Sequence, residues 1–119
     1  MGGIAAYREN SVTTQPKGRL VVMLYEGAIK FLRQAMLEMD RQDPAAKGQF
    51  IVRALDVITE LDCSLDMEAG GEIAKSLRSL YAFMRRHLCE ANIHQDARKI
   101  QDVIRLLEDL LEAWRVIAG

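Results

Sequence analysis

Apolar and polar positions recur along most of this chain with the spacing of an amphipathic helix. Between residues 17 and 40 the tightest apolar line alternates steps of four and three, which is the seam of a helix packed in a bundle. Three later segments, beginning near residues 44, 72 and 96, repeat this spacing. No segment shows the two-residue alternation of a β-strand. The pattern therefore predicts four helices and no sheet.

Each predicted helix contributes one line of residues to a shared core. The lines are Val21, Tyr25, Ala28, Leu32, Ala35 and Met39 in the first helix, Ile51, Ala54, Ile58, Leu61 and Leu65 in the second, Ile73, Leu77, Leu80, Met84 and Ala91 in the third, and Ile100, Val103, Leu107, Leu110, Trp114 and Ile117 in the fourth. His87 interrupts the third line.

Capping and turn residues set the expected helix ends. Pro16 and Pro44 each stand where a helix should begin, because proline suits the first helical turn. Asp43 is the expected N-cap of the second helix. Gly70–Gly71 is expected to supply the turn before the third, and Asn92 to end the third in a left-handed conformation.

The connections "RQDP", "DMEAGG" and "NIHQ" are short, so helices adjacent in sequence should be antiparallel. The expected fold is all-α, an antiparallel up-down-up-down four-helix bundle formed by residues 16–119. Residues 1–15 are expected to be a short flexible or partly helical N-terminal segment with a small apolar patch around Ile4 and Tyr7.

The helices carry more apolar residues than a bundle seam and one flank require, which is about three in seven. The additional flank residues are Val22, Leu24, Ile29, Phe31 and Met36, then Phe50, Leu55 and Val57, then Ala74, Tyr81, Phe83 and Leu88, then Ile104, Leu106 and Leu111. Two readings remain open. The flanks could thicken the core, or they could form an exposed surface for an amphipathic helix or an extended segment laid in a groove.

Charge and composition narrow the class of protein. The formal net charge of −1 argues against binding nucleic acid through its phosphates. No apolar run is long enough to cross a membrane, and the first residues lack the order of a signal peptide. Cys63 and Cys89, without CxxC spacing, are expected to be reduced, half-buried thiols. These features predict a cytoplasmic protein.

Residues that carry chemistry are few. His87 and His94 lack the i, i+4 spacing of a helical metal pair, and no Glu-x-x-His motif is present. The serines lack a nearby histidine in sequence and a nucleophile-elbow pattern. We therefore expect no metal, no cofactor and no enzymatic activity, and we interpret the chain as a binding protein.

Two motifs occur in order, "MLYEGAI" at 23–29 and "LDMEAGGEIAKSLRSLYAFM" at 65–84. They are accompanied by Tyr7, Pro16, "AN" at 91–92, Asp96 and "AW" at 113–114. With these residues the chain resembles the FliS family of flagellar export chaperones across nearly its whole length. The family fold is an antiparallel helical bundle, as the pattern predicts.

The resemblance implies a function. FliS proteins bind the C-terminal segment of flagellin in the cytosol, prevent its premature polymerisation and help deliver it to the flagellar type III export apparatus. The client is disordered when free and forms helices on the chaperone. The surplus apolar flanks would then be covered by flagellin. An export-gate component and a co-chaperone are further candidate partners.

The candidate groove residues are the outward flanks Val22, Ile29, Phe31, Phe50, Val57, Phe83 and Leu106, together with Tyr7. The resemblance also suggests that Ile4 and Tyr7 cover the groove until flagellin displaces them. The motif residues Leu24, Tyr25, Leu80 and Tyr81 fit core packing equally well.

Two alternatives remain. The first is a self-associating helical adaptor that binds another amphipathic helix, in which apolar flanks pack between two copies; an unliganded chaperone could form a homodimer in the same way. The second is a small metal-dependent helical enzyme.

Overall fold

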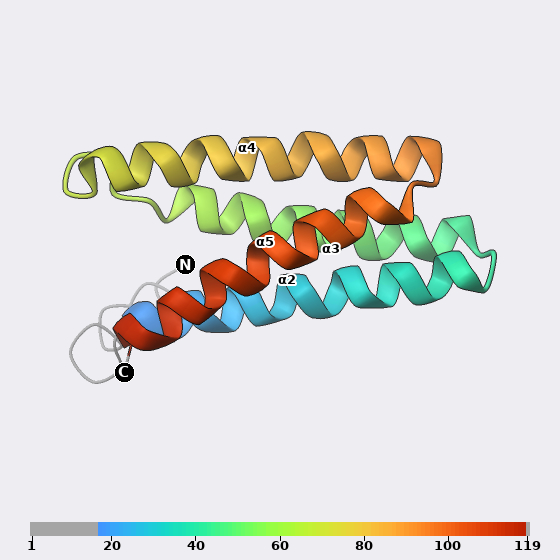
Figure 1. Ribbon diagram of the computed structural model, residues 1–119, viewed down its shortest axis with the longest axis horizontal. Helices are drawn as coiled ribbons and strands as arrows, with labels where there is room; N and C mark the ends of the chain where they lie inside the picture. The colour runs from blue at the N-terminus through green and yellow to red at the C-terminus, as the bar shows by residue number, and fades with distance from the viewer. Residues whose placement is uncertain (1–16, 119) are drawn as a thin grey trace, which may run out of the picture.

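The computed structural model describes residues 17–118 of the chain, almost all of them helical. The four helices are α2 (Lys17–Asp40), α3 (Pro44–Cys63), α4 (Gly71–His94) and α5 (Ala97–Ala118). Consecutive helices run antiparallel (Figure 1). Each helix packs against the next, and α2 also packs against α5, so the four form a closed ring. The predicted all-α bundle is confirmed; residues 1–16, with the predicted N-terminal segment, lie outside the described part.

The start of α3 agrees with the sequence. The Asp43 carboxylate accepts a hydrogen bond from the backbone N–H of Ala46 at 3.0 Å, and Pro44 opens the helix. The predicted glycine turn is also present before α4. Gly71 has a φ of +53°, and a side chain on Gly70 would come within 2.6 Å of the Ala74 Cβ. Both positions therefore need glycine.

The predicted end of the third helix is wrong. α4 continues through Asn92 to His94, and Gln95 adopts the left-handed conformation with a φ of 54°. The backbone N–H groups of Gln95 and Asp96 both bond to the Ala91 carbonyl, which closes the last turn. Asn92 stays helical, and its own carbonyl accepts a hydrogen bond from Lys47 of α3.

The core lines of α2 and α3 are largely as predicted. Tyr25, Ala28, Leu32 and Ala35 are buried in α2, and Ile51, Ala54, Ile58 and Leu61 in α3. In α4 the predicted line is right at Met84 and Ala91, half-buried at Leu77 and Leu80, and wrong at Ile73. The structure buries Ala74, Tyr81, Met84, Leu88 and Ala91, whereas Ile73 is 73% exposed. The two α4 lines lie on adjacent stripes that share Met84 and Ala91, so helical spacing alone does not choose between them.

Much of the apolar surplus thickens the core. Six of the flank residues are buried: Ile29, Ala74, Tyr81, Leu88, Ile104 and Leu111. Others are half-buried and pack against that core. The reading in which the flanks thicken the core therefore accounts for most of them. Cys63 and Cys89, expected to be half-buried, are both exposed.

One charged side chain lies inside the bundle. Lys47, in the first turn of α3, is 1% exposed, and its Nζ donates a hydrogen bond to the Asn92 carbonyl in the last turn of α4 at 3.0 Å. A cation suits the C-terminal end of a helix, where carbonyls lack partners. Burial nevertheless disfavours the charge and lowers the pKa of the Lys47 ammonium below its ordinary value of 10.5.

The burial of Lys47 makes the free energy of unfolding depend on pH in the alkaline range. Because the unfolded chain binds this proton more tightly than the native state, the free energy of unfolding gains a term that rises as the pH approaches 10.5 from below. Lys47→Met should remove that term. The free energy of unfolding of the parent should therefore increase relative to that of the variant as the pH rises. Urea unfolding at pH 7, 8.5 and 10 measures the difference. Gln49→Met, at an exposed position of the same helix, should keep the pH dependence of the parent. Parallel curves for the parent and Lys47→Met would contradict this account.

Candidate functional site

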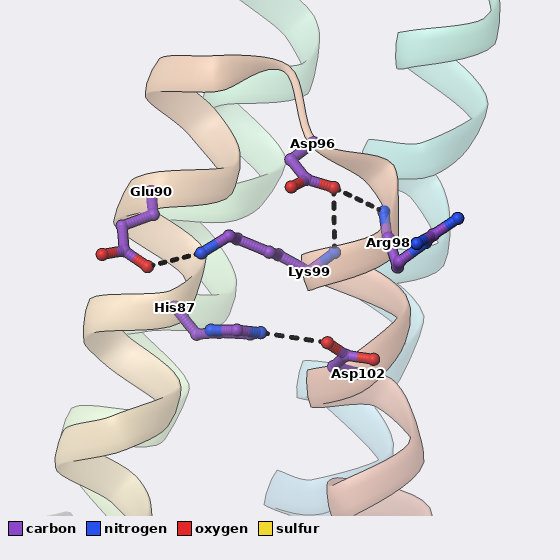
Figure 2. A network of polar contacts seen from close by, with 6 residues as sticks. All are labelled: His87, Glu90, Asp96, Arg98, Lys99 and Asp102. Atoms are coloured by element: carbon purple, nitrogen blue, oxygen red, sulfur yellow. Dashed lines mark hydrogen bonds and ion pairs between the residues drawn. The ribbon is translucent and has the colours of Figure 1, made fainter.

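Polar contacts fasten α4 to α5 at one end of the bundle (Figure 2). The Lys99 Nζ donates to Glu90 at 2.7 Å, and the His87 Nε2 lies 3.1 Å from the Asp102 carboxylate. The first pair lowers the pKa of Glu90 and raises that of Lys99. In the connection between the helices, Asp96 caps α5 by accepting from two backbone N–H groups. The beginning of α5 is therefore held against the end of α4.

At the opposite end of the bundle, α5 is separated from α4. It runs obliquely from the end of α4 to the start of α2 (Figure 1). There it leaves a cleft of about 520 Å³. The lining comes from the first turns of α2, the end of α3 with the following loop, the first half of α4, and the last part of α5. The described lining residues are Gly18, Leu20, Val21, Leu24, Glu60, Leu61, Ser64, Leu65, Asp66, Ala69, Gly70, Ile73, Ala74, Leu77, Tyr81 and Trp114.

The cleft is apolar and only partly filled by the described part of the bundle. Val21, Leu24 and Leu77 are half-buried on its walls, and Ile73 is 73% exposed at its edge. Among the described lining residues, Glu60 and Asp66 are charged. The Asp66 carboxylate accepts hydrogen bonds from the backbone of its own loop. The cleft thus offers apolar contacts and suits an apolar segment of a partner.

Two tyrosines form a polar contact beside the cleft. Tyr81, which lines it, and Tyr25 are 1% and 0% exposed, and their hydroxyl oxygens lie 2.5 Å apart. Burial raises the pKa of both hydroxyls, and the hydrogen bond with Tyr25 adds to the rise for Tyr81. For Tyr25, hydrogen bonds with Tyr81 and with Trp114 oppose the rise. Each buried hydroxyl therefore has the other as its partner, and the pair joins α2 to α4 across the ring.

The model of one protein family, described as "Flagellar protein FliS", matches residues 2–119 of the chain. The chain belongs to the FliS family. A "Flagellar secretion chaperone FliS" of Salmonella typhimurium is 39% identical over 121 residues, which cover 98% of this chain and 90% of that protein. The protein of the same name from Vibrio cholerae is 37% identical, with coverages of 95% and 86%. The one from Bacillus subtilis is 34% identical, with coverages of 92% and 81%.

The groove residues predicted for this member of the FliS family do not line the cleft in the described part of the chain. None of those in the described part is among its lining residues. Val22, Phe31, Phe50, Val57 and Leu106 are half-buried and pack against the core. Phe83 is 39% exposed and stacks on His87, with ring centroids 4.7 Å apart. Tyr7 and Ile4, the predicted cover, lie outside the described residues.

Ile29 has a different environment. It is 5% exposed, belongs to the core, and also borders a second hollow between α2 and α5. That hollow is lined largely by charged residues. Two ion pairs join its walls, Arg33 with Glu108, and Arg115 with Glu26 at 2.8 Å. Such a surface favours a polar contact over an apolar client.

Several residues that line the cleft were expected in the core. Val21, Leu65, Leu77 and Trp114 all stand on predicted core lines, as does the exposed Ile73. Each lies toward the end of its line at the same end of the bundle. A core line is covered only as long as the neighbouring helices stay close. The useful signal was therefore position along the helix, because the end of a core line loses its cover where the bundle opens.

The Tyr25–Tyr81 pair allows a double-mutant cycle. Tyr25→Phe leaves the buried Tyr81 hydroxyl without its partner and should lower the free energy of unfolding by about 1–3 kcal/mol. Tyr81→Phe leaves the Tyr25 hydroxyl with Trp114 alone and should cost less. The double variant removes both hydroxyls and should cost clearly less than the sum. Urea unfolding with unchanged m-values measures the three differences. Additive costs would show that the two hydroxyls do not stabilise each other.

Proposed function

We propose that this chain is a flagellar export chaperone. Its cleft holds the C-terminal segment of flagellin in the cytoplasm, prevents premature polymerisation and assists delivery to the type III export apparatus. The observation that carries the proposal is the apolar cleft at the open end of the bundle. Family membership supports the chaperone role, because relatives across several bacteria carry the name flagellar secretion chaperone.

The energetics of an apolar cleft suit a disordered client. Ordering such a segment costs about 2–5 kcal/mol or more. Burying one Leu, Ile or Phe side chain contributes about 1.5–3 kcal/mol. Two or three client side chains in the cleft can therefore offset the cost of ordering. The same client residues would pack against neighbouring subunits in a filament, so occupying them blocks assembly by competition.

The beginning of the chain is a candidate cover for the cleft. Ile4 and Tyr7 lie outside the described residues, but the described chain begins at the cleft, since Gly18 and Leu20 of the first turn of α2 line it. Residues 1–16 are therefore joined to the bundle at the edge of the cleft. In this proposal they shield its apolar walls until the client displaces them.

Ile73 tests the cleft. Ile73→Gln removes an apolar side chain from its edge and should weaken flagellin binding about tenfold or more. The melting temperature should hardly change, because the side chain is 73% exposed. Ile93→Gln is a matched control, since Ile93 lies on the same helix with the same exposure and is not among the cleft residues. Calorimetric titration with flagellin of the same organism measures both.

Two comparisons in that titration test the proposal, one between two forms of flagellin and one between the two variants. Flagellin without its C-terminal segment should not bind, and intact flagellin should bind with the negative heat capacity change of apolar burial. Equal binding of both flagellins would reject the proposed client. Equal effects of Ile73→Gln and Ile93→Gln would reject the cleft as its site. A dimer that persists when flagellin is added would favour the self-associating adaptor.

The cover is tested by deletion of residues 1–10. If Ile4 and Tyr7 compete with flagellin, the shortened chain should bind flagellin several-fold more tightly and be less soluble without it. The bundle should keep its melting temperature within a few degrees. Titration calorimetry and light scattering give the two readouts. No change in either would show that these residues do not cover the cleft.

A further inference from the structure

Gly27 stands in the interior of α2, where glycine is unfavourable. It is the eleventh residue of a 24-residue helix. Glycine in such a position destabilises a helix relative to alanine, because glycine has more conformational freedom in the unfolded chain and loses it on folding. The backbone does not require it either. Among the described glycines, only Gly71 has a positive φ, so an L-residue would fit the conformation at Gly27.

The described part of the bundle gives no steric reason for this glycine. Apart from its chain neighbours and the adjacent backbone of α2, a Cβ built on Gly27 would meet no described atom within 4 Å. Gly70 differs, because its Cβ would lie 2.6 Å from the Ala74 Cβ. Neither local conformation nor packing within the described bundle therefore explains Gly27. A close approach to the α2 backbone from outside the described bundle would require a glycine at this position.

The surface around Gly27 is apolar. Residues three and four positions away are neighbours on the surface of a helix. Three of the four such neighbours are large and apolar: Met23, which is 59% exposed, and Leu24 and Phe31, which are half-buried. The half-buried Gly27 is thus a position without a side chain between large apolar neighbours, and this position is called the notch below.

The notch continues the cleft. Leu20 and Leu24 line the cleft, and Gly27 follows them at positions i+7 and i+3, on the same face of α2. A segment that leaves the cleft along this face would reach Gly27 within one helical turn. Phe31 extends the same face by one more turn.

We propose that a helix of the bound flagellin segment leaves the cleft and crosses α2 in direct contact with the backbone of Gly27. Without a side chain at the crossing point, two helices can approach to the short end of the usual 8–10 Å between axes. Apolar side chains of the client then fit between Met23, Leu24 and Phe31. This inference rests on the proposed function and adds a second contact region to the cleft.

Substitution of Gly27 separates binding from stability. Gly27→Ala should raise the melting temperature by about 3–6 °C, because alanine is the better helix former. It should also weaken flagellin binding about tenfold, since even one methyl group disturbs a close helix crossing. Gly27→Leu should weaken it further. Gly48→Ala is the control. Gly48 also lies within a helix, and its Cβ would have ordinary contacts, the nearest being 3.7 Å from Asn92. It should raise the melting temperature without changing the affinity.

Melting curves and calorimetric titration of the full chain with intact flagellin give every readout. Unchanged affinity of Gly27→Ala, with normal binding by the parent, overturns this inference and leaves the cleft proposal standing. Equal weakening by Gly48→Ala also overturns it, because general rigidity would then explain the loss. A lower melting temperature of Gly27→Ala overturns it too, since residues 1–16 of the chain itself would then occupy the notch. Absence of binding by the parent removes the proposed function and this inference together.

Discussion

A ring of four helices buries the apolar core lines of its members only where all four helices stay in contact. The position of the core and of the cleft depends on this constraint. α5 is held to α4 at its beginning by the Glu90–Lys99 and His87–Asp102 contacts. At its other end, Arg115 pairs with Glu26 of α2. Along its length α5 passes from the side of α4 to the side of α2 (Figure 1). The oblique course of α5 therefore closes the bundle at one end and opens it at the other.

The regular features of the fold follow from the sequence because each has a local cause. Asp43 caps α3 through its own carboxylate, and the glycine turn before α4 is set by steric limits within a few residues. At the beginning of α4 the buried position was predicted incorrectly, since Ile73 and Ala74 begin two plausible stripes and only the neighbouring helices choose between them. The end of α4 was misplaced for a similar reason. Asn92 and Gln95 can both take a left-handed conformation, and Asn92 is instead engaged by Lys47 from α3.

The candidate site was harder to predict because its residues are chemically the same as core residues. Leu77 and Trp114 lie on the same predicted lines as the fully buried Met84 and Leu107. The difference arises from the separation between α4 and α5, which depends on contacts distant in sequence. The same residue types serve the core and the cleft, and this has a physical reason in a member of the FliS family. In the proposed function, a cleft made from interrupted core lines would present a client with the surface that a fifth helix would need.

The open end of the bundle has a practical consequence for labelling this chain. The start of α2 and the end of α5 lie at the same end of the bundle (Figure 1). Both border the cleft, through Gly18 and Trp114. A fluorophore or affinity tag attached at either place would sit at its mouth and compete with whatever enters. Gln42 and Gln95 lie together at the far end, in the turns that join α2 to α3 and α4 to α5. A reporter in one of those turns would leave the entrance unobstructed.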